Sequence, residues 1–564
     1  MRKFVNDPRA VMREMLEGFA DFAPGQALIA DHGVILRADI PADPAQRGVA
    51  LISGGGSGHE PAHAGYVGAG MLHAAVAGDV FTSPSVDAVL AAIRASAGPA
   101  GALLIVKNYT GDRLNFGLAA ELARTDGIPC EIVIVADDVA LRDTVPPDRR
   151  RGIAGTVLVH KVTGAAAADG LPLEAVARDA RDAAAALGTM GVALGACTVP
   201  AAGTPGFTLA DDEMELGLGI HGEPGVSRTA LASADAIVTR MLETIRDDLD
   251  LRAGEHAALL VNGLGGTPPM ELGIIGRHAL AVLRAWDIAV ARAWCGSFLT
   301  ALEMPGCSLS VMRVDEARLG RLDAPAGAPA WPGPGHIPAA RQVVIQTEPP
   351  RAAEPAGTVD PRLRAAAMAV AAALEAGEPE LTALDSVAGD GDLGISLARG
   401  AAAIRALPDA AWSGPVRALT ETAGALRRAI GGSSGPFYAT ALLRAASVLP
   451  RDAAPSATDW TRAFAAGAAA ISELGGAKAG DRTMLDALLP AAEAFSAAVG
   501  HGEALAMAWS RALAAAEAGV MATEAMHPRL GRASYLGERA IGSRDAGAAG
   551  VVVWMRALRS VGLG

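Results

Sequence analysis

The sequence has few aromatic residues and few cysteines, and both shortages narrow the kinds of protein it can be. Phe, Trp and Tyr make up only 4% of the 564 residues, so the hydrophobic cores must be built mainly from Ala, Leu and Val. The 4 cysteines form no CxxC pair, which favours buried free thiols over a disulfide or a zinc role. Free thiols are typical of a reducing compartment, and we therefore expect a cytoplasmic protein.

Long apolar runs and basic runs are also missing. No uninterrupted apolar stretch is long enough to span a bilayer, and the N-terminus lacks the apolar core of a signal peptide. The formal net charge is −13, with no basic run of the kind that binds nucleic acid. We therefore expect neither a membrane nor a nucleic acid as a partner. An acidic protein that handles phosphates must gather metal ions, positive side chains or backbone N–H groups locally.

Hydrophobic patterning predicts two domains of different class. Over residues 1–325, short apolar strands alternate with helical stretches, which is typical of an α/β domain with mostly parallel sheets. A second α/β subdomain is expected to begin near residue 190. Residues 359–564 form long Ala/Leu/Arg stretches broken by glycine loops, which predicts an all-α domain. The expected strands are 48–53, 102–106, 131–135, 156–159, 257–261 and 288–291.

Two further segments have clear local patterns. Residues 326–358 are rich in proline among small residues, and we expect an extended interdomain linker there, stiffened by proline rather than folded. Near the N-terminus, Val11 and Met15 fall at helical spacing and predict a helix over 7–23, with Asp7 as its cap.

Three aspartates in the helical half, Asp385, Asp390 and Asp392, lie among small residues and glycines. Glycine allows the segment to curl until the three carboxylates face one point. Crowded carboxylates need a cation, and Mg²⁺ bound in this way keeps open positions for substrate phosphates. A solvated acidic loop or a structural Ca²⁺ loop would show the same local pattern. The aspartates therefore raise the hypothesis of a nucleotide–magnesium site.

Further glycine-rich loops lie in the same helical half. Residues 431–436 offer hydroxyls and bare N–H groups that suit phosphate oxygens. Residues 477–484 could supply a polar rim, and residues 531–539 with 545–548 could close the site. Each loop alone more often just joins two helices. Four such loops in one helical domain, one of them bearing the aspartates, favour a nucleotide site.

The α/β half carries its candidates in glycine-rich segments expected to follow strands. The run 54–58 offers exposed backbone N–H groups just before His59, with a spacing that matches neither the GxGxxG nor the P-loop pattern. His221 is flanked by glycines, and a neutral imidazole is a competent nucleophile. Asp112 could take a proton from a substrate hydroxyl. The alternatives are structural histidines and an ordinary turn residue at Asp112.

Seven of these segments, in this order, resemble the dihydroxyacetone kinase family, in the form with both domains fused and ATP as donor. The resemblance covers nearly the whole chain apart from the linker. It implies that the helical domain is an eight-helix barrel with the nucleotide at one end. The matching segments are 53–61, 107–116, 219–225, 389–392, 431–435, 480–484 and 531–535.

The resemblance also implies roles for residues that would hold the acceptor. His221 would bind the carbonyl carbon of a short ketose covalently, as a hemiaminal. Glycerol has no carbonyl group and could not form this bond. His59 and Asp112 would hydrogen-bond the substrate hydroxyls, with Asp112 as the base for the attacking hydroxyl. The residues that would help to hold the substrate are Gly54, Gly55 and Lys107.

On the donor side, the family implies that Asp385, Asp390 and Asp392 hold two Mg²⁺ ions that bridge the ATP phosphates. The residues expected near the nucleotide are Gly432, Ser433, Ser434, Thr483, Met484, Arg539, Asp545 and Gly547. The sequence departs from the family pattern at Leu393, where a histidine is common, and at Ala546, where a proline is common. The first change removes a hydrogen-bonding group, whereas the second removes no functional group.

The leading interpretation is an ATP-dependent kinase that phosphorylates dihydroxyacetone. Four alternatives stay open: a four-carbon ketose such as erythrulose as acceptor, a phosphocarrier protein as donor, a side activity that cyclises FAD and releases AMP, and a non-catalytic ketose sensor. The family further implies a homodimer, and in the domain-swapped form of such a dimer the linker would span between subunits.

Overall fold

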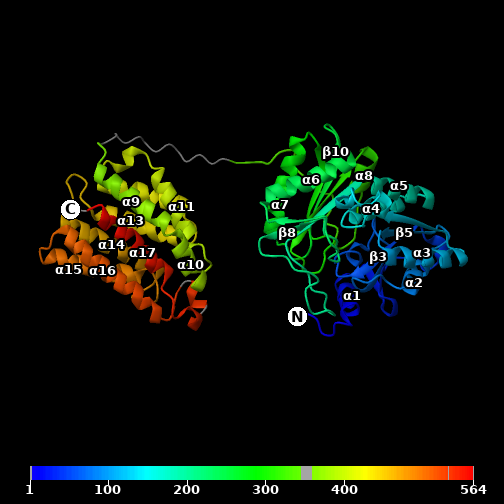
Figure 1. Cartoon of the computed structure of the whole chain (residues 1–564), viewed down its shortest axis with the longest axis horizontal. Helices are drawn as coiled ribbons and strands as arrows, with labels where there is room; N and C mark the ends of the chain where they lie inside the picture. The colour runs from blue at the N-terminus through cyan, green and yellow to red at the C-terminus, as the bar shows by residue number, and fades with distance from the viewer. Residues whose placement is uncertain (1–2, 345–357, 531, 536, 563–564) are drawn as a thin grey trace. The chain divides into compact units, whose positions relative to one another are not determined.

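The computed structural model describes residues 3–344, 358–530, 532–535 and 537–562. The chain divides into two compact units, Met1–Ile345 and Gln346–Gly564 (Figure 1). The first unit contains two six-stranded sheets and their helices, and the second is entirely helical in its described residues. The expected class, an α/β domain with two subdomains followed by an all-α domain, is confirmed.

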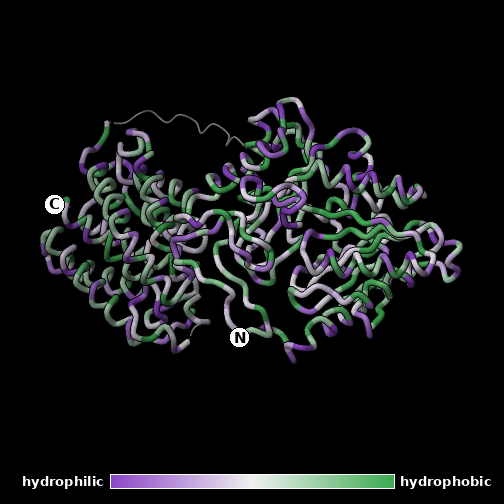
Figure 2. Tube along the Cα trace, turned by 45° about the vertical axis from the view of Figure 1, so that its right-hand side comes forward, coloured by the Kyte–Doolittle hydropathy of each residue, from purple (hydrophilic) through white to green (hydrophobic). Residues whose placement is uncertain are grey.

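The first sheet has the strand order β1-β2-β4-β3-β5-β6, and its hydrophobic central strands stand out in Figure 2. Four neighbouring strands of this sheet, β4, β3, β5 and β6, run parallel to one another, and β6 forms one edge of the sheet. Successive side chains along these strands are buried on opposite faces of the sheet. Ile52 and Leu104 pack against α2 and α3, whereas Leu51 and Leu103 pack against α4 and α5. The elements are α1 (Val11–Phe22), β1 (Gln26–Ile29), β2 (Val34–Arg37), β3 (Ala50–Ser57), β4 (Ala74–Val80), α2 (Val86–Ser96), β5 (Ala102–Lys107), α3 (Thr110–Thr125), β6 (Cys130–Val135), α4 (Thr156–Ala168) and α5 (Leu173–Ala185).

The second sheet has the order β11-β10-β12-β7-β8-β9 and is mainly antiparallel. Only β10 and β11 pair in parallel among its strands in the described residues. The prediction of mostly parallel pairing is therefore wrong for this sheet. The loop 217–226 between β8 and β9 contains no crossover helix, and a parallel connection needs one. The elements are β7 (Leu187–Ala193), β8 (Glu213–Leu216), β9 (Ser227–Ala230), α6 (Ala234–Leu249), β10 (His256–Gly263), α7 (Pro269–Ala285), β11 (Ala289–Gly296), β12 (Gly306–Arg313) and α8 (Glu316–Asp323).

Two local predictions in this unit are also wrong. The expected strand at 156–159 is the first turn of α4, a helix that is buried on nearly every side. A short continuous apolar run does not distinguish a buried strand from a buried helix. The N-terminal helix begins at Val11, and Asp7 instead accepts a hydrogen bond from the backbone N–H of Arg9 in a preceding turn.

The first part of the predicted linker packs against the α/β unit. Trp331 is buried against Trp294, whose indole N–H donates to the carbonyl of Gly333. Residues 326–338 therefore belong to the α/β unit, because an exposed tryptophan would leave a large apolar surface in water. Most of the remaining linker, 345–357, lies outside the described residues. The cysteines are all free, and Cys295 is exposed rather than buried as expected.

The helical unit is a closed ring of eight helices. Around the ring, α9, α11, α12, α13, α14, α15, α16 and α17 each pack against the next, and α17 packs back on α9. The short helix α10 lies beside α11, outside the ring order. The expected eight-helix barrel is thus present. The helices are α9 (Pro361–Ala376), α10 (Glu378–Ala388), α11 (Leu393–Arg405), α12 (Pro415–Ala429), α13 (Ser434–Val448), α14 (Ala457–Gly475), α15 (Leu485–Gly500), α16 (Leu505–Ala522) and α17 (Ala546–Ser560).

The barrel encloses an apolar cavity of about 340 Å³, lined by side chains such as Leu374, Phe464 and Trp509. Small alanines dominate the helix contacts, so the ring closes without filling its centre. None of the described helices is both long and apolar enough to cross a membrane.

Candidate active site

Strand β3 delivers the first group of predicted residues into a buried turn. His59 follows the strand and is fully buried, with its Nδ1 2.7 Å from the carbonyl oxygen of Thr300. Gly54 and Gly55 leave room for close neighbours. A Cβ atom at Gly54 would lie 2.3 Å from the carbonyl oxygen of Val76, and one at Gly55 would lie 2.9 Å from Lys107 Nζ. Glycine at these positions therefore allows the neighbouring strand and a buried ammonium group to approach the backbone.

His221 lies in the loop 217–226 between β8 and β9, with its side chain 21% exposed. Its Nδ1 is 2.8 Å from Glu223 Oε1, and its backbone N–H donates to Glu223 Oε2 at 2.9 Å. Its Nε2 is 3.0 Å from Nε2 of His59. The rings of Phe81 and Tyr109 contact the imidazole edge to face, at centroid distances of 5.1 and 4.7 Å. The imidazole is therefore fixed in orientation while remaining partly accessible.

Lys107 and Asp112 occupy the end of β5 and the first turn of α3. Asp112 was expected in a loop, but it is a helical residue. Both side chains are buried, and Oδ1 of Asp112 has no hydrogen-bond partner among the described residues. The Tyr109 hydroxyl is likewise buried without a described partner. Buried polar atoms normally have partners, so these two oxygens are candidates to bind a polar ligand.

Burial and neighbouring charges set the ionisation of this site. Burial, followed by the positive charge of Lys107, holds the pKa of His59 well below its usual value, so its imidazole is neutral at pH 7. Burial acts to raise the pKa of Glu223, but hydrogen bonds from His221 outweigh it and lower this pKa to about 2. Burial also lowers the pKa of Lys107, against the attraction of Asp112.

Several residues of this site were not predicted from the sequence. Glu223 is two positions after His221 in a quoted segment, and a carboxylate so near a candidate nucleophile was a usable signal. Phe81 and Thr300 come from distant parts of the chain and have no local pattern that could identify them.

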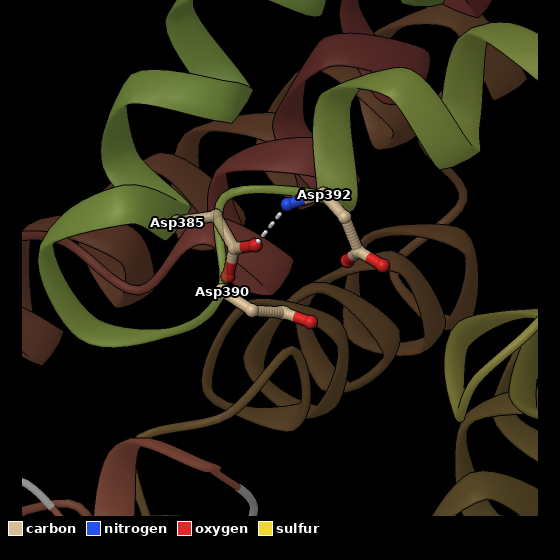
Figure 3. A group of neighbouring side chains, drawn as sticks. All are labelled: Asp385, Asp390 and Asp392. Carbon is tan, nitrogen blue, oxygen red and sulfur yellow. Dashed lines mark hydrogen bonds between the residues drawn. The ribbon is translucent and has the colours of Figure 1, made fainter. Parts of the chain in front are cut away.

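The predicted metal ligands meet at one end of the helical barrel (Figure 3). Asp385, near the end of α10, and Asp390 and Asp392, in the following loop, each offer an oxygen within 4.8 Å of the others. Oδ2 of Asp385 accepts hydrogen bonds from the backbone N–H groups of Asp392 at 2.9 Å and Leu393 at 3.2 Å. These bonds curl the loop, and the resulting all-oxygen donor set fits Mg²⁺.

Several helices are expected to begin at this end of the ring. Short connections join the consecutive ring helices from α11 to α16 and favour antiparallel neighbours, which would start α11, α13 and α15 on the side of the aspartates. Helix N-termini present free N–H groups and a partial positive charge, which favour phosphate. The predicted nucleotide residues in the first turns of α13, α15 and α17, or just before them, are Gly432, Ser433, Ser434, Thr483, Met484, Asp545 and Gly547.

Contacts and charge effects link these helix starts. The Asp545 carboxylate accepts from Ala548 N–H at 2.8 Å, and a Cβ on Gly547 would lie 3.5 Å from Cβ of Met484. Burial raises the pKa of Asp545 to about 6, and the negative charges of Asp486 and Asp385 add to the shift. The starts of α15 and α17 therefore lie close to the aspartate loop.

Two other predicted positions differ from simple expectation. Leu393 packs, partly buried, against the hydrophobic core of the barrel, so the leucine contributes packing where the family pattern has a polar group. Arg539 lies in the 3₁₀ turn Gly537–Ala540, and its side chain is outside the described part of the chain.

Arg482 lies in the glycine-rich segment 477–484 but was not predicted as a site residue, and it links this loop to the barrel. It is 1% exposed and donates to the carbonyls of Ala540 at 2.8 Å, Ser543 at 2.9 Å and Thr523 at 3.3 Å. The carbonyls of Ala540 and Ser543 lie just before α17, and the carbonyl of Thr523 lies at the end of α16. The guanidinium thus holds the segment that leads into Asp545.

Replacing Arg482 with methionine should destabilise the protein. The Arg482→Met variant leaves buried carbonyls without donors, and we expect the free energy of unfolding to fall by about 2–4 kcal/mol. Urea denaturation of the full chain, followed by tryptophan fluorescence, measures this loss. Arg529→Met is the matched control, because that side chain is 73% exposed. Equal unfolding midpoints for the two variants would show that Arg482 is dispensable.

The α/β unit, the eight-helix barrel and the carboxylate cluster define a kinase built from two fused domains. The chain belongs to the dihydroxyacetone kinase family: the Dak1 domain matches residues 17–330 and the DAK2 domain matches residues 387–560.

Relatives match along the whole length. The chain is 44% identical to the putative 3,4-dihydroxy-2-butanone kinase of Solanum lycopersicum, over 99% of this chain and 97% of that protein. It is 43% identical to triokinase/FMN cyclase of Mus musculus, over 99% of this chain and 98% of that protein. Among solved structures, the dihydroxyacetone kinase of C. freundii in complex with AMP-PNP and Mg²⁺ matches with a TM-score of 0.63 and 34% identity, over 99% of each chain.

Proposed function

We propose that the protein transfers the γ-phosphate of Mg²⁺·ATP to a primary hydroxyl of a short ketose, with dihydroxyacetone as the first choice. The observation that carries this proposal is the partly exposed His221 imidazole, oriented by Glu223 within the same domain as Asp112, whose buried Oδ1 has no hydrogen-bond partner among the described residues. An oriented nucleophile for the carbonyl and a free acceptor for a hydroxyl proton are the two groups that a hydroxyketone requires.

In this proposal His221 forms a hemiaminal with the carbonyl carbon, while His59 and Lys107 hold the substrate oxygens. Asp112 accepts the proton of the hydroxyl that attacks phosphorus. Gly54 and Gly55 allow the backbone to approach the bound sugar closely. The covalent bond selects ketones over glycerol, because glycerol offers no carbonyl carbon to His221.

On the donor domain, Asp385, Asp390 and Asp392 would hold two Mg²⁺ ions, which supply neutralisation of the triphosphate charge. The N–H groups and hydroxyls of Gly432, Ser433 and Ser434 bind phosphate oxygens at the start of α13. Thr483 and Met484 contribute the start of α15, and Arg539, Asp545 and Gly547 border the nucleotide. Phosphoryl transfer depends mainly on such positioning and electrostatic stabilisation. The C. freundii relative, solved with AMP-PNP and Mg²⁺, supports this type of donor.

A four-carbon ketose is the second candidate acceptor, because the tomato relative is named for a four-carbon hydroxyketone and such a ketone presents the same group to His221. A cyclase side activity on a flavin nucleotide is a further candidate, since the mouse relative carries that name. We also propose that the protein is a cytoplasmic homodimer, and a domain-swapped form of this dimer would let the two domains meet across subunits.

A substrate panel tests the proposal on the full chain with ATP and Mg²⁺. We expect turnover with dihydroxyacetone and erythrulose and none above the no-sugar background with glycerol, measured by coupled ADP release. A specificity constant for erythrulose well above that for dihydroxyacetone would make the four-carbon sugar the natural acceptor. Phosphorylation only after addition of phosphocarrier proteins would refute ATP as the donor, and no phosphorylation under any condition would leave a ketose sensor.

A further inference from the structure

The site draws its residues from both sheets of the α/β unit. The His221 loop, residues 217–226, joins two strands of the second sheet, whereas His59, Lys107 and Asp112 lie at or just after the ends of strands in the first sheet. Capture of a ketose needs these groups at one point, and a displacement of about 1 Å can cost a reaction about 100-fold. The His221 loop therefore needs a firm attachment to the first sheet.

Arg151 supplies such an attachment from the connection between β6 and α4. Its side chain is 11% exposed, and its Nε and Nη2 donate to Oδ2 of the buried Asp138 at 2.8 and 2.7 Å. Asp138 lies just after β6 of the first sheet. Nη2 of Arg151 also donates to the carbonyl oxygen of Gly217 at 2.6 Å. One guanidinium group thus joins a buried carboxylate of the first sheet to the start of the His221 loop.

The same guanidinium approaches Glu223 across Gly219. A Cβ atom on Gly219 would lie 2.1 Å from Oε2 of Glu223 and 2.6 Å from Nη1 of Arg151, so these two groups border the space that a side chain would occupy. Opposite charges at such short range attract each other. Glu223 in turn contacts both Nδ1 and the backbone N–H of His221. The attraction therefore opposes movement of the carboxylate away from the imidazole.

We propose that Arg151 is a positioning residue for ketose capture, which ties the His221 loop to Asp138 and keeps Glu223 in place against the imidazole. The inference rests on the proposed hemiaminal and identifies what sets the position of its nucleophile. Arg151 forms and breaks no bond with the sugar. It acts through the carbonyl of Gly217 and the carboxylate of Glu223.

The Arg151→Met variant should weaken capture more than phosphoryl transfer. We expect the dissociation constant of the dihydroxyacetone adduct and KM to rise about 10- to 100-fold, because the loop loses its attachment. The value of kcat at saturating sugar should stay within about threefold of the wild type, since Asp112 and the donor domain are unchanged. Intact-protein mass spectrometry across sugar concentrations and coupled ADP release measure the two effects. An unchanged KM would overturn the proposal.

Arg150→Met is the matched control. The side chain of Arg150 is also 11% exposed and pairs with Asp248 on α6 at 2.8 Å. Both variants remove one partner of a largely buried ion pair, so both should lower the urea midpoint of unfolding. Only Arg151→Met should raise KM. An equal rise in KM for Arg150→Met would mean that general destabilisation, and not positioning, causes the effect.

Gly219→Ala disturbs the same contact without removing a charge. The three nearest atoms to its new Cβ belong to the ends of the Glu223 and Arg151 side chains, so these ends must move while the backbone can stay in place. We expect KM to rise as in Arg151→Met, with a urea midpoint close to that of the wild type. Gly206→Ala, where a Cβ would meet open space, is the control and should match the wild type. A wild-type KM in Gly219→Ala would contradict the role of the Glu223 contact.

NMR of the sugar-free, ¹⁵N-histidine-labelled protein separates this inference from the proposed function. Nδ1 of His221 faces a carboxylate acceptor, so it carries a proton that should give a downfield resonance, assigned by its absence in His221→Ala. This resonance should be lost in Arg151→Met and kept in Arg150→Met. If it is lost in this way but the wild type forms no adduct, the proposed function fails and the positioning role stands. An adduct in the wild type, with an unchanged resonance and KM in Arg151→Met, gives the reverse result.

Discussion

The His221→Ala variant is expected to form no covalent adduct with dihydroxyacetone and to lose at least about 10³-fold in kcat/KM, which corresponds to about 4 kcal/mol. Alanine removes the nitrogen that attacks the carbonyl carbon, and no other side chain in the described site is oriented by a carboxylate as His221 is by Glu223. The adduct is measured by intact-protein mass spectrometry and the rate by coupled ADP release. Mg²⁺·ATP binding, on the other domain, should be unchanged.

His278→Ala is the matched control for this experiment. The side chain of His278 is also 21% exposed and also faces a carboxylate, Asp235 at 3.4 Å, but it lies on α7 away from the glycine-rich loops. This variant should keep both adduct and turnover. If His221→Ala still captured the ketone at the wild-type level, the nucleophile would have to be another residue.

The fold was predicted best for elements whose hydrophobic pattern fits only one type of secondary structure. The apolar runs at β3 and β5 are buried on both faces, and strands of this kind read as continuous hydrophobic stretches between helices. The same reasoning failed at 156–159, because α4 is buried on nearly every side and has no polar face to reveal its period. It also failed for pairing direction in the second sheet, which depends on chain reversals rather than on composition.

The site residues also divide into those that could be predicted from the sequence and those that could not. Asp385, Asp390 and Asp392 could be predicted because they are close in sequence, at the end of α10 and in the loop that follows, where local hydrogen bonds bring them together. The facing imidazoles could not, because His59 and His221 are 162 positions apart and only the tertiary structure joins them. From the sequence alone, Leu393 is only the loss of a hydrogen-bonding group. In the structure its side chain packs against the barrel core.

Asp390→Ala should separate donor chemistry from acceptor capture. The variant is expected to keep the dihydroxyacetone adduct at the wild-type level, because His221 and its partners lie on the other domain. Turnover should fall about 10²- to 10³-fold, since a metal ion supplies several kcal/mol of charge stabilisation in phosphoryl transfer. Removing Mg²⁺ with a chelator should abolish wild-type turnover while leaving the adduct intact, as measured by the same two assays.

The control for the donor experiment is Asp452→Ala, an exposed carboxylate in the loop between α13 and α14. It removes the same charge from the same domain, so unchanged turnover there would exclude a general effect of net charge. Partial rescue of Asp390→Ala by higher Mg²⁺ is also expected, because Asp385 and Asp392 still offer two oxygens to the ion. Wild-type turnover in Asp390→Ala at low Mg²⁺ would refute the metal assignment. Loss of the adduct in that variant would instead mean that the two domains do not act separately.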